Sequence, residues 1–235
     1  MDANSTVDNP VQNAGTVPIV HVKSAMPGPN SFWVLYGQHT KPTYLEDAGD
    51  GQQAQRDNGL KMVRSWRTAL DIGSNIGQWT RPLAKRFTKV ICFEPNPNFR
   101  ECFNMNIRES NVELYPYGLS SHEHTATQGT NATHLNDSVG DTEPQVGDIE
   151  CKTLDSFNFK EVDYVKIDVD GFEVPLLKGA AWTLQKNSPV INIEMKKTKR
   201  PQIVAEAQYI LKRWGYKFVS RTRSDEIWLK SNITA

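Results

Sequence analysis

A glycine-rich turn with an acidic residue at its start is the first group in this sequence that could do chemistry. It holds Asp71, Gly73, Ser74, Asn75 and Gly77, and it lies between an apolar run and a helical pattern. Glycines at such a position allow a tight turn and a close approach of the backbone to a ligand. The carboxylate of Asp71 would repel a phosphate but attract a ligand with an ammonium and a sulfonium group. The turn therefore favours S-adenosylmethionine over a dinucleotide as the cofactor.

The next apolar run ends in a second carboxylate, Glu94, about twenty residues beyond the turn. In nucleotide-binding α/β folds an acid at this spacing accepts hydrogen bonds from the ribose hydroxyls. After the third apolar run, Tyr117 and Gly118 are expected to border the adenine. These residues extend the predicted cofactor site beyond the turn.

A third group could act on a methyl acceptor. Methyl transfer from a sulfonium is an in-line displacement, and a hydroxyl acceptor must lose its proton during the reaction. Asp168, at the end of a predicted strand, is the expected general base and is also expected to contact the cofactor. Lys196 is expected to orient the acceptor or to stabilise a developing oxyanion. Asp170 is the alternative base.

A divalent cation is a second cofactor that the sequence leaves open. Asp168, Asp170 and Glu194 could together present oxygen atoms to Mg²⁺ or Ca²⁺. The residues from 168 to 171 do not form an EF-hand loop, because Lys166 falls at the first ligand position. The sequence therefore assigns no residue as a metal ligand.

The elements that must position these residues follow from the apolar pattern. Buried runs that alternate with helices are typical of a parallel sheet that is covered on both faces. We therefore predict a Rossmann-like α/β fold, with a mostly parallel seven-stranded sheet, helices on both faces and an antiparallel C-terminal strand. The predicted strands are 68–72, 89–93, 112–115, 164–169, 190–194, 216–220 and 226–229, and the predicted core helices are 76–86, 98–109, 173–185 and 201–214.

The length of 235 residues favours one domain. Residues 1–30 are rich in polar and small residues and predict a flexible arm. Residues 31–235 predict a single domain, in which 31–66 form an N-terminal segment with a helix and 67–235 form the core. Residues 120–148 contain few large apolar residues and predict a long polar loop.

Charge and cysteine content limit the kinds of partner and cellular compartment that we expect for this protein. Lysine plus arginine and aspartate plus glutamate both number 27, so no overall basic field indicates a polyanionic partner. Cys92, Cys102 and Cys151 form neither a CxxC pair nor an even set, which suits a reduced, cytoplasmic protein. Residues 1–30 contain no apolar run long enough for a signal peptide or a membrane span, so we expect no membrane partner. The oligomeric state is not predicted.

The ordered set of motifs resembles the FkbM-type methyltransferases over about residues 66–220. Two departures from the family pattern are Ser74, where alanine is common, and Asp170, where glutamate is usual. The matching segments are Asp-Ile-Gly-x-Asn-x-Gly at 71–77, Phe-Glu-Pro at 93–95, Thr-Leu-Asp at 153–155 and the Lys-Ile-Asp segment at 166–173.

The resemblance implies a class I methyltransferase that uses S-adenosylmethionine. It also implies O-methylation, commonly of a hydroxyl on a sugar or another small molecule.

Two other functions compete with this reading. Ribose 2′-O-methylation of RNA usually needs two lysines, an aspartate and a glutamate, which Lys41, Asp168, Lys196 and Glu226 could supply. The balanced charge argues against a long nucleic-acid footprint. A binding module without activity is the third reading, and the intact glycine turn, Glu94 and Asp168 argue against it.

Overall fold

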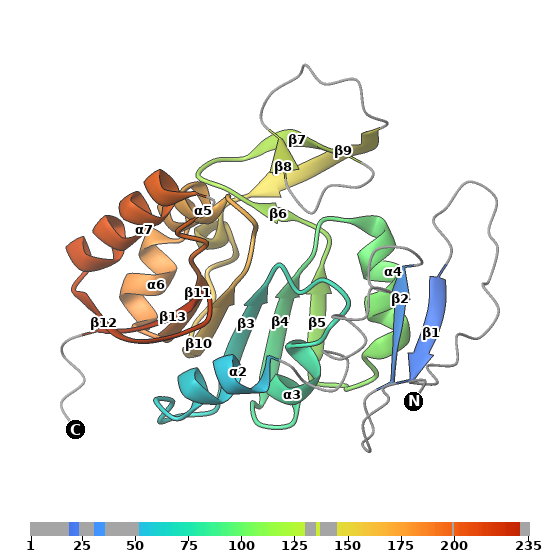
Figure 1. Cartoon of the computed structure of the whole chain (residues 1–235), viewed down its shortest axis with the longest axis horizontal. Helices are drawn as coiled ribbons and strands as arrows, with labels where there is room; N and C mark the ends of the chain where they lie inside the picture. The colour runs from blue at the N-terminus through green and yellow to red at the C-terminus, as the bar shows by residue number, and fades with distance from the viewer. Residues whose placement is uncertain are drawn as a thin grey trace.

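A seven-stranded sheet forms the centre of the molecule (Figure 1). The structure is a computed structural model that describes residues 19–23, 31–35, 52–129, 135–136, 145–198 and 200–230. The strands of this sheet are β3 (Thr68–Ile72), β4 (Lys89–Phe93), β5 (Val112–Tyr115), β10 (Val162–Ile167), β11 (Val190–Glu194), β12 (Tyr216–Thr222) and β13 (Asp225–Lys230). Their order is β12-β13-β11-β10-β3-β4-β5. β13 pairs antiparallel with both of its neighbours and the other pairs are parallel, which confirms the predicted sheet.

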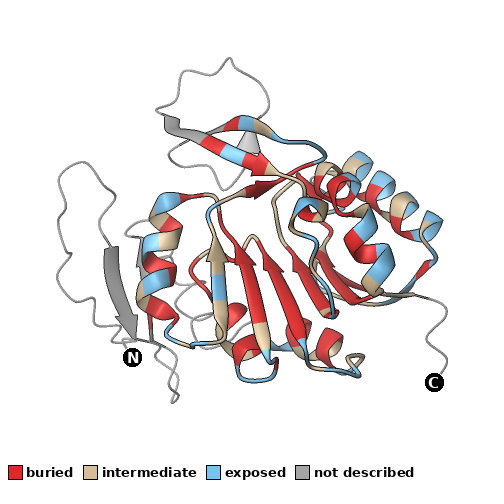
Figure 2. Ribbon diagram, turned by 180° about the vertical axis from the view of Figure 1, so that it is seen from behind, coloured by how far each residue is buried: buried red, intermediate tan, exposed pale blue. Residues whose placement is uncertain are grey.

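Helices cover both faces of the sheet because successive residues of each strand point to opposite sides. In β10, Val165 and Ile167 pack toward one set of helices, whereas Tyr164 packs toward the other. The first set is α5 (Glu173–Gly179), α6 (Ala181–Asn187) and α7 (Pro201–Arg213), and the second is α2 (Gln53–Leu60), α3 (Thr80–Ala84) and α4 (Pro97–Asn106). The central strands β3, β4, β10 and β11 are accordingly buried along most of their length, whereas the edge strands β5 and β12 are not (Figure 2).

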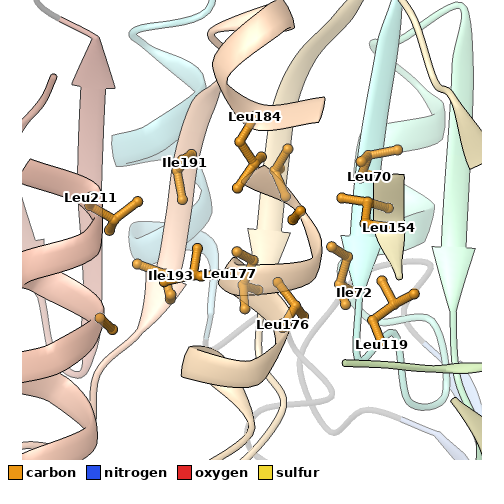
Figure 3. Packing of buried hydrophobic residues seen from close by; sticks show 14 of the residues in the cluster. Leu70, Ile72, Leu119, Leu154, Leu176, Leu177, Leu184, Ile191, Ile193 and Leu211 are labelled. Atoms are coloured by element: carbon orange, nitrogen blue, oxygen red, sulfur yellow. The ribbon is translucent and has the colours of Figure 1, made fainter. Parts of the chain in front are cut away.

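Branched aliphatic residues make the larger of the two cores, on the side of α5, α6 and α7 (Figure 3). Leu70, Ile72, Ile191 and Ile193 are at most 1% exposed, and they share this core with leucines of the three helices. Full burial of such a side chain contributes about 1.5–3 kcal/mol. The packing therefore fixes the strands whose ends carry the predicted site.

The prediction of a long polar loop at 120–148 was wrong in part, because some of these residues form a second sheet. Its strands are β6 (Gly118–Leu119), β7 (His124–Gly129), β8 (Leu135–Asn136) and β9 (Gln145–Lys152), in the order β6-β9-β7-β8. Ala126, Ile149 and Cys151 form its small core. A sequence as polar as that of β7 has no alternation of apolar residues to reveal a strand.

The predicted helix at 173–185 is two helices, α5 and α6. The helix is interrupted at Ala180, where φ is −115° and ψ is 7°. The carboxylate of Asp155 accepts hydrogen bonds from the backbone N–H groups of Trp182 (2.9 Å) and Thr183 (2.8 Å), so it satisfies the start of the second helix. Asp155 belongs to a short 3₁₀ turn (Leu154–Phe157). The Thr-Leu-Asp motif therefore contributes a helix cap.

Within residues 1–30, β1 (Ile19–Lys23) pairs antiparallel with β2 (Ser31–Leu35). Two hydrogen bonds join β2 to the end of α4: the Trp33 N–H donates to Asn106 Oδ1 (2.6 Å), and Asn106 Nδ2 donates to the Trp33 carbonyl (2.9 Å). The rest of residues 1–30, and Lys41, lie outside the described residues. In the described part of the chain, no helix has the length and apolar character needed to cross a membrane.

Candidate active site

A cavity lies where β3, β4, β10 and β11 end, at the edge of the sheet where ligands bind in open α/β folds. Eight of the nine predicted cofactor contacts line it: Asp71, Gly73, Ser74, Asn75, Glu94, Tyr117, Gly118 and Asp168. The predicted Lys196 lines it as well. Gly77 is the one predicted contact among the described residues that does not.

The glycine turn brings the backbone of β3 against β10. Gly73 has a φ of +79°, and a Cβ built on it would lie 1.9 Å from the carbonyl oxygen of Asp168. The backbone N–H groups of Gly73 and Ser74 both donate to the Phe93 carbonyl, at 2.9 and 3.1 Å. Only glycine fits at position 73, because the backbones are in contact there.

Gly77 packs closely against the end of α4. Its φ is +92°, and a Cβ there would lie 2.7 Å from Cγ1 of Ile107, at the end of α4. The chain continues in a turn after Gly77, and α3 begins only at Thr80, later than the predicted start at 76. Gly77 therefore serves close packing between this turn and the end of α4.

Glu94 is buried and held by two backbone donors. Its Oε2 accepts from the Asn75 N–H (2.9 Å), and its Oε1 accepts from the Asn96 N–H (2.8 Å). Burial raises the pKa of Glu94 to about 7, against the effect of these two hydrogen bonds. The same Asn96 caps α4 through its side chain, which accepts from the Asn98 N–H (2.9 Å).

Asp71 is 1% exposed and lies under the start of α3. Its Oδ2 accepts a hydrogen bond of 2.6 Å from the Thr80 hydroxyl. Burial raises the pKa of Asp71 to about 6, and the Thr80 hydrogen bond and the nearby Lys166 oppose that shift. The site thus places a carboxylate where a cationic group of a ligand could compensate its charge.

Asp168 lies beside a buried lysine. Lys166 Nζ is 3.4 Å from Asp168 Oδ2 and 2.8 Å from Asp225 Oδ1. Burial raises the pKa of Asp168 to about 7; the Lys166 charge lowers it, whereas Glu194 raises it further. A carboxyl group with a pKa near neutral is matched to proton transfer at physiological pH.

Lys196 lies between two carboxylates. Its Nζ is 2.5 Å from Asp170 Oδ1 and 2.7 Å from Glu194 Oε2. Burial lowers the pKa of Lys196, but the bonds to Asp170 and Glu194 outweigh this and raise it. Asp168, Asp170 and Glu194 bring one oxygen each within 4.8 Å of one another, a spacing that could hold a metal ion. Ammonium groups already compensate these carboxylates.

Gln52, Trp79 and Lys166 are polar or aromatic residues of the cavity wall that were not among the predicted site residues. The Trp79 indole N–H donates to the Gln52 side-chain oxygen, and the Trp79 ring lies 4.7 Å from Lys166 Nζ. Lys166 carried a detectable signal, since residues 166 and 168 of one strand point to the same face. Gln52 and Trp79 carried none, because a turn gives no periodicity.

A family model matches most of the core of this chain. A model described as the methyltransferase FkbM domain matches residues 71–218, which is more than half of the 235-residue chain. The chain therefore belongs to the FkbM methyltransferase domain family. A comparison with curated proteins finds no match.

Solved structures give the fold. The chain is similar to an FkbM methyltransferase from Methylobacillus flagellatus, with 15% identity and a TM-score of 0.50, over 79% of this chain and 53% of that one. It also resembles a precorrin-6y C5,15-methyltransferase from Geobacter metallireducens (11% identity, TM-score 0.48, 84% of this chain and 92% of that one). A putative RNA methyltransferase from Pyrococcus horikoshii is comparable (13% identity, TM-score 0.49, 86% and 93%). The fold is that of the Rossmann-like class I methyltransferases, and the chain spans about half the length of the M. flagellatus protein.

Proposed function

We propose that this protein transfers a methyl group from S-adenosylmethionine to a hydroxyl of a carbohydrate or a similar small molecule. The observation that carries the proposal is the gathering of Asp71, Glu94 and Asp168 around one cavity at the carboxyl ends of the parallel strands. Membership of the FkbM family supports the same reaction class.

The residues of the cavity fit the cofactor in chemical type. Glu94 would accept hydrogen bonds from the ribose hydroxyls. Its carboxylate is held in a fixed orientation, because a backbone N–H group donates to each of its two oxygens. Asp71 would compensate the positive charge of the methionine end. Tyr117 and Gly118 would border the adenine. Tyr117 offers an aromatic ring, and Gly118 is buried in β6.

Bound S-adenosylmethionine would supply an electrophilic methyl group on a sulfonium. Asp168 would accept the proton of the acceptor hydroxyl as the oxygen attacks, so that the O–CH₃ bond forms while the sulfur–carbon bond breaks. Lys196 would orient the acceptor oxygen, and the carboxylates of Asp170 and Glu194 hold its ammonium in place. The products would be the methyl ether and S-adenosylhomocysteine.

The charge of the cavity favours a neutral acceptor over RNA. Among its described lining residues, carboxylates outnumber ammonium groups: Asp71, Glu94, Asp168, Asp170 and Glu194 against Lys166 and Lys196. Such a wall repels phosphates. Glu226, which an RNA ribose methyltransferase site would need, is fully buried and bonded to Gln208, so it is not available to a ribose.

Transfer of a labelled methyl group tests the proposal. The protein is incubated with methyl-labelled S-adenosylmethionine and, separately, a pool of neutral glycans and a pool of short RNAs. We expect label in the glycan fraction. A mild treatment that degrades sugars but not RNA should remove that label. Label confined to RNA would replace the proposal by the ribose alternative.

A further inference from the structure

The buried ammonium of Lys166 connects the C-terminal hairpin to the proposed base. Its Nζ lies 2.8 Å from Asp225 Oδ1 in β13 and 3.4 Å from Asp168 Oδ2 at the end of β10. The side chain of Lys166 is 2% exposed and that of Asp225 is 7% exposed. The face of the Trp79 ring covers the ammonium at 4.7 Å. Three elements therefore meet at one charged atom.

The same hairpin also holds the neighbouring strand end. The Met195 N–H donates to the Ser224 carbonyl (2.7 Å), and the Ser224 hydroxyl donates to Glu194 Oε1 (3.1 Å). Arg221 donates to the Met195 carbonyl (2.7 Å). The hairpin of β12 and β13 thus contacts the acidic strand ends of β11 directly and of β10 through Lys166.

A buried ion pair is a poor device for stability alone. Removing two charges from water is costly, and an apolar pair of similar volume often serves as well or better. Asp225 does not line the cavity, whereas Lys166 and Asp168 both do. The pair between Asp225 and Lys166 is therefore best explained by what it does to Asp168.

We propose that Asp225 is a positioning residue for methyl transfer, which holds the Lys166 ammonium so that this ammonium orients the Asp168 carboxylate toward the acceptor. The inference rests on the proposed function, in which Asp168 accepts the hydroxyl proton. Asp225 acts only through Lys166, because its own carboxylate is buried against the Lys166 ammonium and does not line the cavity.

A double-mutant cycle tests the inference in the full chain. Asp225→Asn should lower kcat about ten- to a hundredfold, a loss typical of partners that orient a functional group, and leave KM for S-adenosylmethionine unchanged. Asp225→Glu, which keeps the charge, should recover part of kcat. In an Asp168→Asn background, Asp225→Asn should have no further effect. Losses that multiply would mean a separate structural contribution and would overturn the inference.

Two further variants separate folding from positioning. Lys166→Met combined with Asp225→Leu removes both charges of the buried pair, and the Asp168 side chain, which is 28% exposed, stays in contact with water. The double variant should therefore melt near the wild-type temperature yet transfer as slowly as Asp225→Asn. Wild-type kcat in this folded double variant would contradict the inference. Asp163→Asn is the matched control, since it breaks an ion pair with Arg67 at the other end of β10 and should leave kcat unchanged.

The position of Lys166 can be read without any acceptor. In ¹⁵N NMR of lysine side chains, a buried paired ammonium exchanges slowly and should give a signal that Lys166→Arg removes. That signal should shift or vanish in Asp225→Asn and persist in Asp163→Asn. An unchanged signal in Asp225→Asn would overturn the inference, whereas a wild-type protein that shows the predicted signal but labels no glycan would contradict only the proposed function.

Discussion

Gly73 and the backbone of Asp168 are in direct contact, since a Cβ on Gly73 would lie 1.9 Å from the Asp168 carbonyl oxygen. This contact joins the turn that would hold the cofactor to the strand that would carry the base. It is reinforced by the Asp168 N–H, which donates to the Ile72 carbonyl at 3.0 Å. The distance between the two halves of the site is thus set by backbone contacts and not by flexible side chains.

Gly73→Ala should therefore disturb both the turn that would hold the cofactor and the strand end that would carry the base, and it should lower stability. The left-handed φ of +79° would cost about 1–2 kcal/mol with a side chain, and the backbone clash would add to that. We expect a loss of more than about 3 kcal/mol in the free energy of unfolding, measured by urea denaturation. Gly215→Ala is the control, because φ is +82° there but nothing lies within 4 Å of the new Cβ. Equal losses in the two variants would mean that the contact with Asp168 is unimportant.

Asp168→Asn should separate binding from turnover. The amide keeps the size of the side chain but cannot accept the acceptor's proton, so kcat should fall about 10²- to 10⁴-fold. Affinity for S-adenosylmethionine, measured by calorimetry, should change less than about threefold. Activity at the wild-type level would move the role of base to Asp170.

A chelator should have little effect on transfer. The Lys196 ammonium lies 2.5 Å from Asp170 and 2.7 Å from Glu194, and Lys166 lies beside Asp168, so these carboxylates already have cationic partners. We expect EDTA to change the rate of transfer less than about twofold. A rate that collapses with EDTA and returns with Mg²⁺ would show that a cation displaces Lys196.

The sequence was most informative where one physical pattern dominates. The strands of the main sheet are buried runs, so their apolar residues and the acids at their ends could be located, and Asp71, Glu94 and Asp168 do meet at one cavity. The helix of residues 201–213 was found because Pro201 begins it and Gly215 follows its end.

Contacts between segments far apart in the chain could not be predicted from the sequence. Asp155 interrupts a helical pattern because its carboxylate reaches the N–H groups of Trp182 and Thr183, 27 and 28 residues away. Gly77 packs against Ile107, which lies 30 residues further along the chain. Neither relationship leaves a periodic signal.

Cofactor affinity should depend on pH through Glu94. Burial raises the pKa of Glu94 to about 7, and the charged form is the better acceptor of hydrogen bonds from the ribose hydroxyls. Affinity should therefore be full above pH 8 and fall as the pH drops through about 7. The measurement is calorimetry from pH 5.5 to 8.5 with Glu94→Gln in parallel. Asp71, whose pKa is raised to about 6, contributes only at lower pH. A pH dependence near 7 that persists in Glu94→Gln would assign it to another group.

Binding of S-adenosylmethionine to wild-type protein and to Glu94→Ala is the most direct test of the central claim. Calorimetry should show one site on the wild-type protein, and Glu94→Ala should weaken it about ten- to a hundredfold, because hydrogen bonds to a charged group contribute about 1.5–3 kcal/mol. Glu113→Ala is the control, since that exposed residue of β5 pairs with Lys89 and should bind like wild type. No heat of binding from well-folded wild-type protein, or equal affinity in Glu94→Ala, would contradict the claim that this cavity holds the methyl donor.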